Sequence, residues 1–347
     1  MLRPEKLKGF VTPEKMKHHA ELLANRIRKQ FRHLSRRFRR QNIDCFRLYD
    51  WDIPEIRAVV DWYAGHVVIG EYERLQTTQD WLSQMAAAVG QALNLPMDKI
   101  HLKRRHTMME GRPRYRRMSR PSQLNVDGTP LTSDIGKAGN SLGKRFEVSE
   151  RNLRFWVNMD DFLDTGLYSD HRDTRVIVRN IAAGKDFLNL YAYTGAFTCA
   201  AAAGEAKTTV TVDRSETYLN WAQDNLKLNG LWGPRHTLVQ SDAMRYLAKA
   251  QREGQRFTLA FVDPPSFFRE RSRGVAFDIS EDHPELIRNV LKVMAPGALV
   301  LFSTNHQRFE PNFHGLAVKE IKELTPKTIP EDYRNRRVHR CWQMVAA

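Results

Sequence analysis

The sequence has few cysteines and no long apolar run. Its three cysteines, Cys45, Cys199 and Cys341, lie far apart and match no disulfide or metal-ligand spacing. No stretch reaches the roughly 18–20 apolar residues of a membrane span, and the opening segment MLRPEKLKGF lacks the apolar core of a secretory signal. We therefore expect a cytoplasmic protein with no membrane partner and no metal.

The basic residues are unevenly distributed. The formal net charge is +15, and residues 1–40 hold 13 Lys and Arg against three acids, while residues 102–120 hold eight against one. Phe31, Phe38 and Tyr115 are interleaved with these charges. Such a pattern favours a polyanion, most often nucleic acid, although a solvated charge run is the alternative. The predicted RNA contacts are Arg36, Arg37, Arg39, Arg40, Lys103, Arg104, Arg105, Arg114, Arg116 and Arg117.

The N-terminal half predicts a helical arm followed by a small domain. Thr12 and Pro13 have the residue types of a helix start, and apolar residues then recur at helical spacing, which predicts a basic helical RNA-binding arm over 1–40. Residues 41–165 predict a small α+β domain that also binds RNA. Its expected elements are strands at 45–50, 66–73 and 99–105, a helix at 77–95 and a hairpin at 146–159.

From residue 166 to 347 short apolar strands alternate with helical stretches. This alternation predicts an α/β fold with a Rossmann-like, doubly wound parallel sheet. Ligands bind such sheets outside the carboxyl ends of the strands. The expected strands are 186–191, 208–213, 236–242, 258–263 and 298–303, and the expected helices are 196–203, 215–228, 243–252 and 283–294.

The predicted strand ends carry a tight turn and three acids. The turn at 191–197 lacks the G-x-G-x-x-G spacing that admits a pyrophosphate, which disfavours a nicotinamide oxidoreductase. Asp213 follows the second strand, where an acid can bind a ribose diol, and Asp242 follows the third, where it can accept from an adenine amino group. Each could also cap a helix. With Asp263 after the fourth strand, the set predicts a pocket for a nucleoside without phosphates.

That constellation resembles the class I S-adenosylmethionine (SAM) methyltransferases. Longer motifs resemble one bacterial family, the 23S rRNA guanine-N7 methyltransferases of the RlmK type, which also form the C-terminal half of RlmKL. The resemblance covers nearly the whole chain, including FRLYDWDIPE (46–55) and the basic arm. The other motifs are DTGLYSDHRDTR (164–175), DFLNLYAYTGAFTCAAAAGEAKTTVTVD (186–213), WAQDNLKLNG (221–230), SDAMRYL (241–247), VDPPSF (262–267) and RNRRVHRCW (334–342).

The resemblance implies a set of SAM contacts. The residues around the methionine part would be Asn189, Tyr191, Thr194, Gly195, Ala196 and Phe197. Asp213 would hold the ribose and Asp242 the adenine, with Arg214 and Ala243 nearby. Asp170 and Arg172 match the family's D-H-R segment, which closes over the cofactor. Tyr168 and Ser169 precede that segment where the family has Phe-Leu, and Ser169 has the residue type of a helix N-cap.

The residue types near the predicted site limit which atom of a base can be methylated. Methylation at C5 of a pyrimidine needs a thiolate adduct, yet the stretch at 302–306 has no cysteine. A ring nitrogen such as guanine N7 has no proton to lose, so positioning is the main requirement. The base must leave its stack, and Asp263, Pro264 and Pro265 would present carbonyl oxygens to it. Phe267 or Phe268 could stack on the base or pack in the core, and an exocyclic amine would fit the same turn.

The resemblance therefore implies a SAM-dependent 23S rRNA guanine-N7 methyltransferase that acts on a flipped guanine. The substrate would be 23S rRNA or a large-subunit precursor, and a separate guanine-N2 methyltransferase, RlmL, is the expected functional partner. Two alternatives remain. One is an rRNA methyltransferase of the same fold acting on cytosine C5 or guanine N2. The other is a non-catalytic RNA-binding ribosome assembly factor.

Overall fold

The computed structural model describes residues 11–72, 80–105, 144–270 and 275–347. The chain divides into two compact units. The first comprises residues 1–152 and 157–165, and the second comprises residues 153–156 and 166–347. Among the described residues, no helix has the length and apolar character needed to cross a bilayer.

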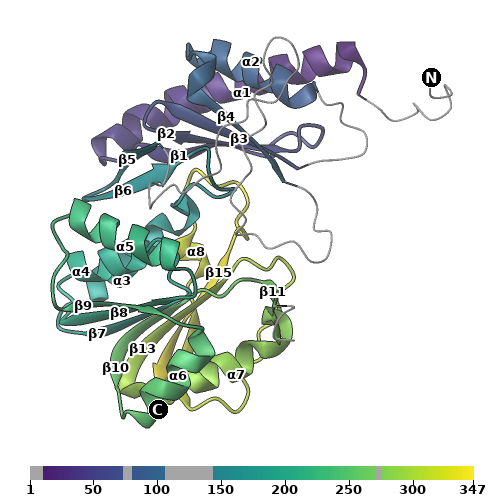
Figure 1. The fold of residues 1–347 in the computed structure, drawn as a ribbon. Helices are drawn as coiled ribbons and strands as arrows, with labels where there is room; N and C mark the ends of the chain where they lie inside the picture. The colour runs from purple at the N-terminus through teal and green to yellow at the C-terminus, as the bar shows by residue number, and fades with distance from the viewer. Residues whose placement is uncertain (1–10, 73–79, 106–143, 271–274) are drawn as a thin grey trace, which may run out of the picture. The chain divides into compact units, whose positions relative to one another are not determined.

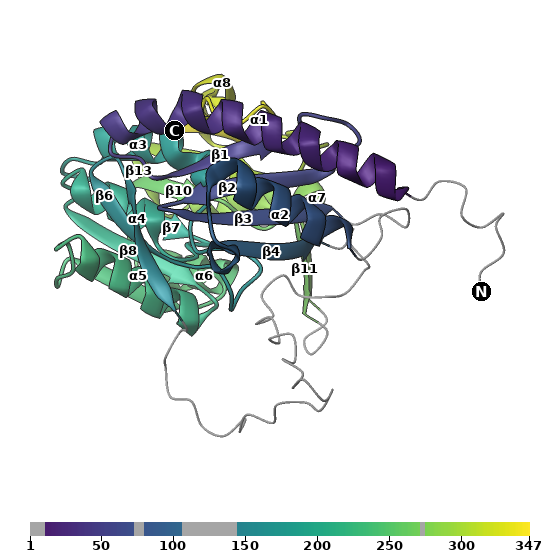
Figure 2. The ribbon, with the colours of Figure 1, turned by 90° about the horizontal axis from the view of Figure 1, so that it is seen from above.

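The first unit is a four-stranded sheet with two helices packed on it (Figures 1 and 2). The sheet order is β1-β2-β3-β4, with antiparallel pairing except between β3 and β4. Its elements are α1 (Pro13–Arg40), β1 (Cys45–Asp50), β2 (Ala58–Tyr63), β3 (His66–Tyr72), α2 (Trp81–Leu93), a 3-10 turn (Met97–Lys99), β4 (Ile100–Arg105) and β5 (Arg145–Glu150). The predicted 45–73 region holds three strands, not two, because β2 was missed.

Helix α1 begins where the sequence predicts. The Thr12 hydroxyl accepts from Lys15 N–H, so Thr12 is the N-cap, and Pro13 follows in the first turn. The apolar stripe faces the unit's core and packs with α2 and β1. The buried side chains of the stripe are Met16, Leu23, Ile27, Leu34 and Phe38, joined by His19. The remaining helix surface is polar and largely basic.

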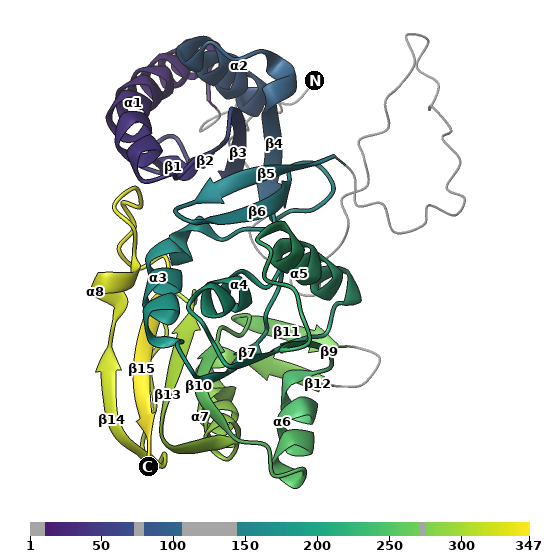
Figure 3. The same ribbon diagram turned by 90° about the vertical axis from the view of Figure 1, so that its left-hand side faces the viewer.

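The second unit is a seven-stranded sheet with helices on both faces (Figures 1 and 3). The sheet order is β14-β15-β13-β10-β7-β8-β9, and β6 (Leu153–Asn158) straddles the unit boundary. Helices α3, α4 and α5 cover one face, and α6 and α7 cover the other. The strands are β7 (Asp186–Leu190), β8 (Thr208–Asp213), β9 (His236–Gln240), β10 (Phe257–Val262), β13 (Met294–Thr304), β14 (Val318–Glu323) and β15 (Arg340–Ala346).

The helices and a hairpin complete this unit. The helices are α3 (Arg172–Ile181), α4 (Ala196–Ala203), α5 (Glu216–Leu228), α6 (Ala243–Arg252), α7 (Ile279–Leu291) and the short α8 (Thr325–Thr328). A two-stranded hairpin, β11 (Phe267–Glu270) and β12 (Val275–Asp278), follows β10 where the sequence predicted a turn alone. The doubly wound prediction is confirmed, although β14 and β15 add an antiparallel edge that it did not include.

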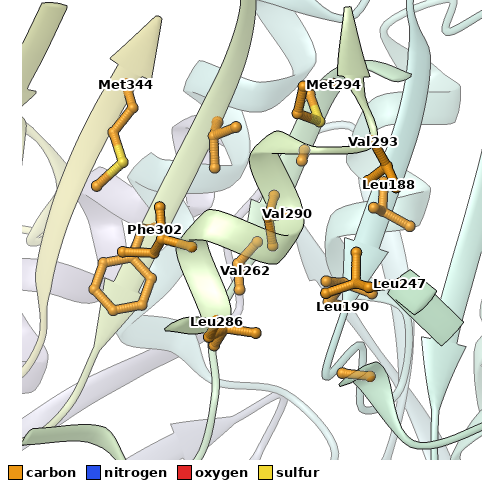
Figure 4. Close-up of a cluster of buried hydrophobic side chains, with 14 of the residues drawn as sticks. Leu188, Leu190, Leu247, Val262, Leu286, Val290, Val293, Met294, Phe302 and Met344 are labelled. Atoms are coloured by element: carbon orange, nitrogen blue, oxygen red, sulfur yellow. The ribbon is translucent and has the colours of Figure 1, made fainter. Parts of the chain in front are cut away.

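Both faces of the central strands are buried, which explains their continuous apolar sequences. Leu188, Leu190 and Val262 enter the cluster under α6 and α7 (Figure 4). Phe187 and Phe261, at the alternate positions, enter the cluster under α3 and α4. The strand order reverses between β7 and β10. A crevice at such a reversal is the usual ligand site of a doubly wound sheet.

Candidate active site

The turn after β7 is held in an unusual backbone conformation. Tyr191, Tyr193 and Gly195 have φ values of 56°, 51° and 72°, so left-handed residues alternate with ordinary ones. Bulky residues rarely adopt this conformation, and such strain is concentrated at functional sites. Helix α4 begins directly after the turn, at Ala196. The backbone N–H groups of its first turn therefore lie beside the strained residues.

Neighbouring elements hold the turn from two sides. Thr194 Oγ1 donates to the Gly166 carbonyl at 2.6 Å, and the Thr194 carbonyl accepts from Asn225 Nδ2 on α5 at 2.9 Å. A Cβ on Gly195 would lie 2.5 Å from the Ala222 Cβ. Only glycine therefore fits there, for reasons of both φ and space.

Asp213, at the end of β8, joins that strand to the turn. Its Oδ2 accepts from Tyr193 N–H and its Oδ1 from Ser215 N–H, each at 2.9 Å. Burial raises the pKa of this carboxyl, while the two N–H donors oppose the increase. Asp242, after β9, caps α6 by accepting from the N–H groups of Met244 and Arg245. Both of those bonds use Oδ1, and Oδ2 accepts no hydrogen bond from the described residues.

Asn189 and Phe197 lie beneath the turn. Asn189 Nδ2 donates to Thr198 Oγ1 at 3.0 Å, and the Thr198 and Thr211 hydroxyls are 2.7 Å apart in the same buried network. The Phe197 ring stacks on Phe261 with centroids 3.5 Å apart. Through these contacts the Asn189 and Phe197 side chains support the predicted cofactor turn from below.

Parallel pairing places Asp263 beside the turn. Val262 pairs with Leu190 and with Phe302, so the next residues, Asp263, Tyr191 and Ser303, emerge at one edge of the sheet. Burial raises the pKa of Asp263 to about 7, and the Asp170 carboxylate adds to this, while His339 and the Ser303 hydroxyl oppose it. A carboxyl with this pKa can exchange a proton near neutral pH.

Two histidines lie against this carboxyl. His171 Nε2 is 3.6 Å from Asp263 Oδ2, and the His171 ring stacks on His339 with centroids 4.0 Å apart and planes at 15°. His339 Nδ1 lies 3.1 Å from Asp170 Oδ2, and its Nε2 lies 2.9 Å from Thr328 Oγ1. Burial first, and then the charge of His339, lower the pKa of His171 well below its usual value.

The Asp170, His171 and His339 ligand atoms lie within 4.8 Å of one another, a spacing that a metal ion could bridge. However, the near-parallel rings keep the in-plane nitrogen lone pairs from converging on one point. We therefore treat the group as a hydrogen-bonded cluster. The absence of a resident metal stays a prediction from the sequence.

The Arg172 side chain forms an ion pair with Asp332. Its two terminal nitrogens lie 3.1 Å from the two oxygens of Asp332, and both side chains are buried. The neighbouring Ser169 hydroxyl bonds to the Tyr333 hydroxyl at 2.7 Å, and Ser169 does not cap the helix. This geometry gives Arg172 a structural partner, so its cofactor contact stays a prediction. Tyr168 is exposed, and its ring centroid lies 5.1 Å from the ring centroid of Tyr193.

The stretch after Asp263 presents an aromatic pair. Pro264 is buried and Pro265 is half-buried. Phe267, 46% exposed, begins β11, while the Phe268 ring packs on Phe277. The Arg214 guanidinium carbon lies 5.2 Å from the Phe268 ring centroid. Of the two phenylalanines, Phe267 is therefore the one available to a ligand. Ala243 is buried at the start of α6.

Residues 76–327 match the model of the S-adenosylmethionine-dependent methyltransferases. The chain belongs to this family. SAM is therefore the cofactor of this methyltransferase, in agreement with the sequence prediction.

Solved structures share the fold of this methyltransferase. SMU.776, assigned as a methyltransferase and complexed with SAH, has 21% identity and a TM-score of 0.67, over 93% of this chain and 82% of that one. A protein from Streptococcus mutans assigned as SAM-dependent has 19% identity and a TM-score of 0.69, over 94% and 81%. The SAM-dependent methyltransferase from Agrobacterium tumefaciens has 17% identity and a TM-score of 0.55, over 88% and 90%.

The predicted RNA contacts have different surroundings. Arg36, Arg37, Arg39 and Arg40 are exposed on α1. Lys103 is 2% exposed and its Nζ donates to the Phe162 carbonyl, so a phosphate contact there does not fit the structure. The side chains of Arg104 and Arg105, and all of Arg114, Arg116 and Arg117, lie outside the described residues.

Sequence reasoning missed the two histidines of the site. His171 and His339 both occur in motifs that were recognised, within SDHR and RVHR. Their pairing was invisible because α3 and β15 lie far apart in the chain. A buried histidine beside a carboxylate at a strand end was the signal that could have found them.

Proposed function

We propose that this methyltransferase transfers the methyl group of SAM to N7 of an unstacked guanine in 23S rRNA or a large-subunit precursor. The observation that carries the proposal is the set of three carboxylates, Asp213, Asp242 and Asp263, at the carboxyl ends of three strands around a strained turn. Asp213 would accept from the ribose hydroxyls, Asp242 Oδ2 from the adenine amino group, and the turn would surround the methionine part. SAM itself supplies an electrophilic methyl group on a sulfonium.

A ring nitrogen suits the residues at the substrate side. N7 attacks with a lone pair and loses no proton, so the site must mainly hold base and methyl donor in line. The thiolate route to cytosine C5 is disfavoured because all three cysteines are buried. Burial raises the pKa of Cys199 to about 12, and it also raises the pKa of Cys341. The choice of N7 over guanine N2 rests on the family resemblance of the sequence.

The basic face of α1 supports an RNA substrate. Arg28, Arg32, Arg36 and Arg39 are among its exposed cations, and a row of such charges attracts a polyanion in a salt-dependent way. The exposed Phe267 ring would stack on a flipped base, which is a common way to hold an unpaired nucleotide.

Two experiments test this function. Isothermal calorimetry should detect SAM binding, and nuclease digestion of 23S rRNA from a deletion strain, followed by mass spectrometry, should show loss of one N7-methylguanosine. A plasmid carrying the wild-type gene should restore the nucleoside, and one carrying Asp213→Ala should not. Loss of N2-methylguanosine instead would assign the other guanine atom. An unchanged nucleoside profile would refute rRNA methylation by this protein.

The role of α1 needs its own test. Arg36→Glu with Arg39→Glu should weaken binding to an rRNA fragment and reduce its salt dependence, while SAM binding stays unchanged. Lys319→Glu with Lys322→Glu, on exposed positions of β14, is the charge-matched control. Equal losses in the two double variants would show that net charge, and not this helix face, determines RNA binding.

A further inference from the structure

An exposed aromatic pair stands out in the first unit. Trp51 directly follows β1 and Tyr72 ends β3, and their side chains are 40% and 37% exposed. The Trp51 backbone has φ = 53°, a left-handed conformation that is a clear outlier for so large a residue. The fold therefore holds a tryptophan at the surface in a strained conformation, where burial gives it little stabilisation. An exposed aromatic residue in a strained conformation points to a ligand.

The two rings form a stack with an arginine beside it. The ring centroids are 5.8 Å apart with planes at 25°, and the Arg57 guanidinium carbon is 4.9 Å from the Trp51 centroid. Backbone bonds fix all three residues across the strands: Trp51 N–H donates to the Ala58 carbonyl, and Tyr72 N–H to the Arg57 carbonyl. Trp51 Nε1 also donates to the Pro54 carbonyl at 3.3 Å, so the indole is fixed in orientation.

Acidic and basic side chains both lie close to this stack in the chain. Asp52, next to Trp51, is bonded to Arg26 of α1, and Asp50 is bonded to Arg47 at 2.8 Å. Both carboxylates that flank Trp51 in the chain thus bond to arginines, although Arg47 also bonds Asp61, and Arg57 is exposed. The Arg26–Asp52 bond also fastens the Trp51 segment to the helix that carries the exposed arginines. Flat rings, a guanidinium and a nearby basic helix together match single-stranded nucleic acid.

We propose that Trp51, Tyr72 and Arg57 form a stacking platform for an unpaired RNA base. This inference rests on the proposed function, in that RNA is taken as the substrate. A base would extend the exposed side of the Trp51–Tyr72 stack, and the Arg57 guanidinium would contact its ring or the adjacent phosphate. The platform would hold a nucleotide of the substrate other than the one that is methylated, and would bind any base by its face.

Equilibrium binding of a labelled single-stranded oligoribonucleotide tests the platform. Tyr72→Leu, which keeps apolar volume without the aromatic ring, should weaken binding about ten-fold, whereas Tyr72→Phe should bind as the wild type does. Trp51→Gly removes the indole and tolerates the left-handed backbone, and it should weaken binding similarly. Trp232→Ala, which removes a 38% exposed tryptophan of the second unit, is the matched control and should have no effect. Circular dichroism and thermal melting establish that each variant is folded.

Two features separate stacking from charge. The slope of log affinity against log salt should be unchanged in Tyr72→Leu, since no phosphate contact is lost, and a duplex of the same length should show no Tyr72 effect. Folded Tyr72→Leu that binds single strands as tightly as the wild type would overturn the platform while leaving rRNA methylation intact. A weakened Tyr72→Leu in a protein that methylates no rRNA would leave the platform standing and remove the proposed function. Wild-type protein that binds no single-stranded RNA would likewise overturn the platform, and the nucleoside profile of the deletion strain would still decide the proposed function.

Discussion

His171 Nε2 lies 3.6 Å from Asp263 Oδ2, at the point where β10 ends and the strand order reverses. The histidine is buried and its pKa is lowered, while the pKa of the carboxyl is raised to about 7. Each environment therefore favours the neutral form of its group. Asp263 therefore changes charge near neutral pH, at the position proposed for the substrate base.

Asp263 should make the stability of the protein depend on pH. Its folded pKa of about 7 lies above the unfolded value of about 3.9, so its stabilising protonated form is fully present below pH 4 and is lost as pH rises through 7. In the Asp263→Asn variant, the side chain at this position is neutral at every pH. The free energy of unfolding of the variant, relative to wild type, should therefore increase between pH 4 and 7 and then level off. Urea titrations at pH 5, 6, 7 and 8 measure this, and a difference that is flat over the range would contradict it.

Gly195 should tolerate alanine less well than Gly254 does. Both have positive φ, 72° and 69°, but only Gly195 has a neighbour in the way, the Ala222 Cβ. Gly254→Ala should cost about 1–2 kcal/mol of unfolding free energy from the left-handed backbone. Gly195→Ala should cost about 1–3 kcal/mol more from overpacking and should also weaken SAM binding. Guanidinium titrations compare the two, and equal costs would show that α5 yields easily at this contact.

Asp213→Ala should weaken SAM binding about 10- to 100-fold, as expected for loss of a charged hydrogen-bond acceptor. The same change removes the acceptor of Tyr193 N–H, so the turn itself should loosen. Asp186→Ala, at the opposite end of β7, is the control, because Asp186 bonds to Thr208 away from the strand ends. Calorimetric titration measures the SAM affinity of both variants. Wild-type affinity in Asp213→Ala would show that this residue does not belong to the cofactor site.

The Arg172–Asp332 pair should behave as a buried ion pair. Asp332→Ala leaves a buried guanidinium without its partner and should cost about 3–5 kcal/mol of unfolding free energy. Replacing both residues, as Arg172→Met with Asp332→Leu, should recover much of that loss. Because Asp332 engages both terminal nitrogens of Arg172, the folded double variant should bind SAM nearly as the wild type does. A large loss of SAM affinity in that variant would instead support the cofactor contact predicted from the sequence.

The central strands could be predicted because their signal is local. A strand buried on both faces reads as a continuous apolar run, and the predicted 186–191 and 208–213 match β7 and β8 to within a residue. Strand β2 was missed because it contains Asp61, whose partner Arg47 is on another strand at 2.8 Å. Strand β14 was missed because its residues are mostly exposed and polar. The local sequence reveals neither this ion pair nor the position of β14 at the sheet edge.

The site was predictable in part for the same reason. Acids at strand ends can be counted once the strands are known, so the positions of Asp213, Asp242 and Asp263 at strand ends were predicted, while their role in the site stays a prediction. Lys103 was misjudged, because a basic run does not reveal that one of its members bonds to the Phe162 carbonyl inside the core. The stacked histidines needed the tertiary fold, since they are brought together by α3 and the segment before β15.

The place of β15 has a consequence for the order in which this protein can fold. β15 lies between β13 and β14, yet it follows both in the chain, and β14 bonds to no other strand of the described sheet. Until residues 340–346 have been synthesised, β14 has no strand to pair with, and the segment carrying His339 is not held at the sheet. Ribosome-bound fragments that end before Arg340 should therefore be open to proteolysis along β13 and β14.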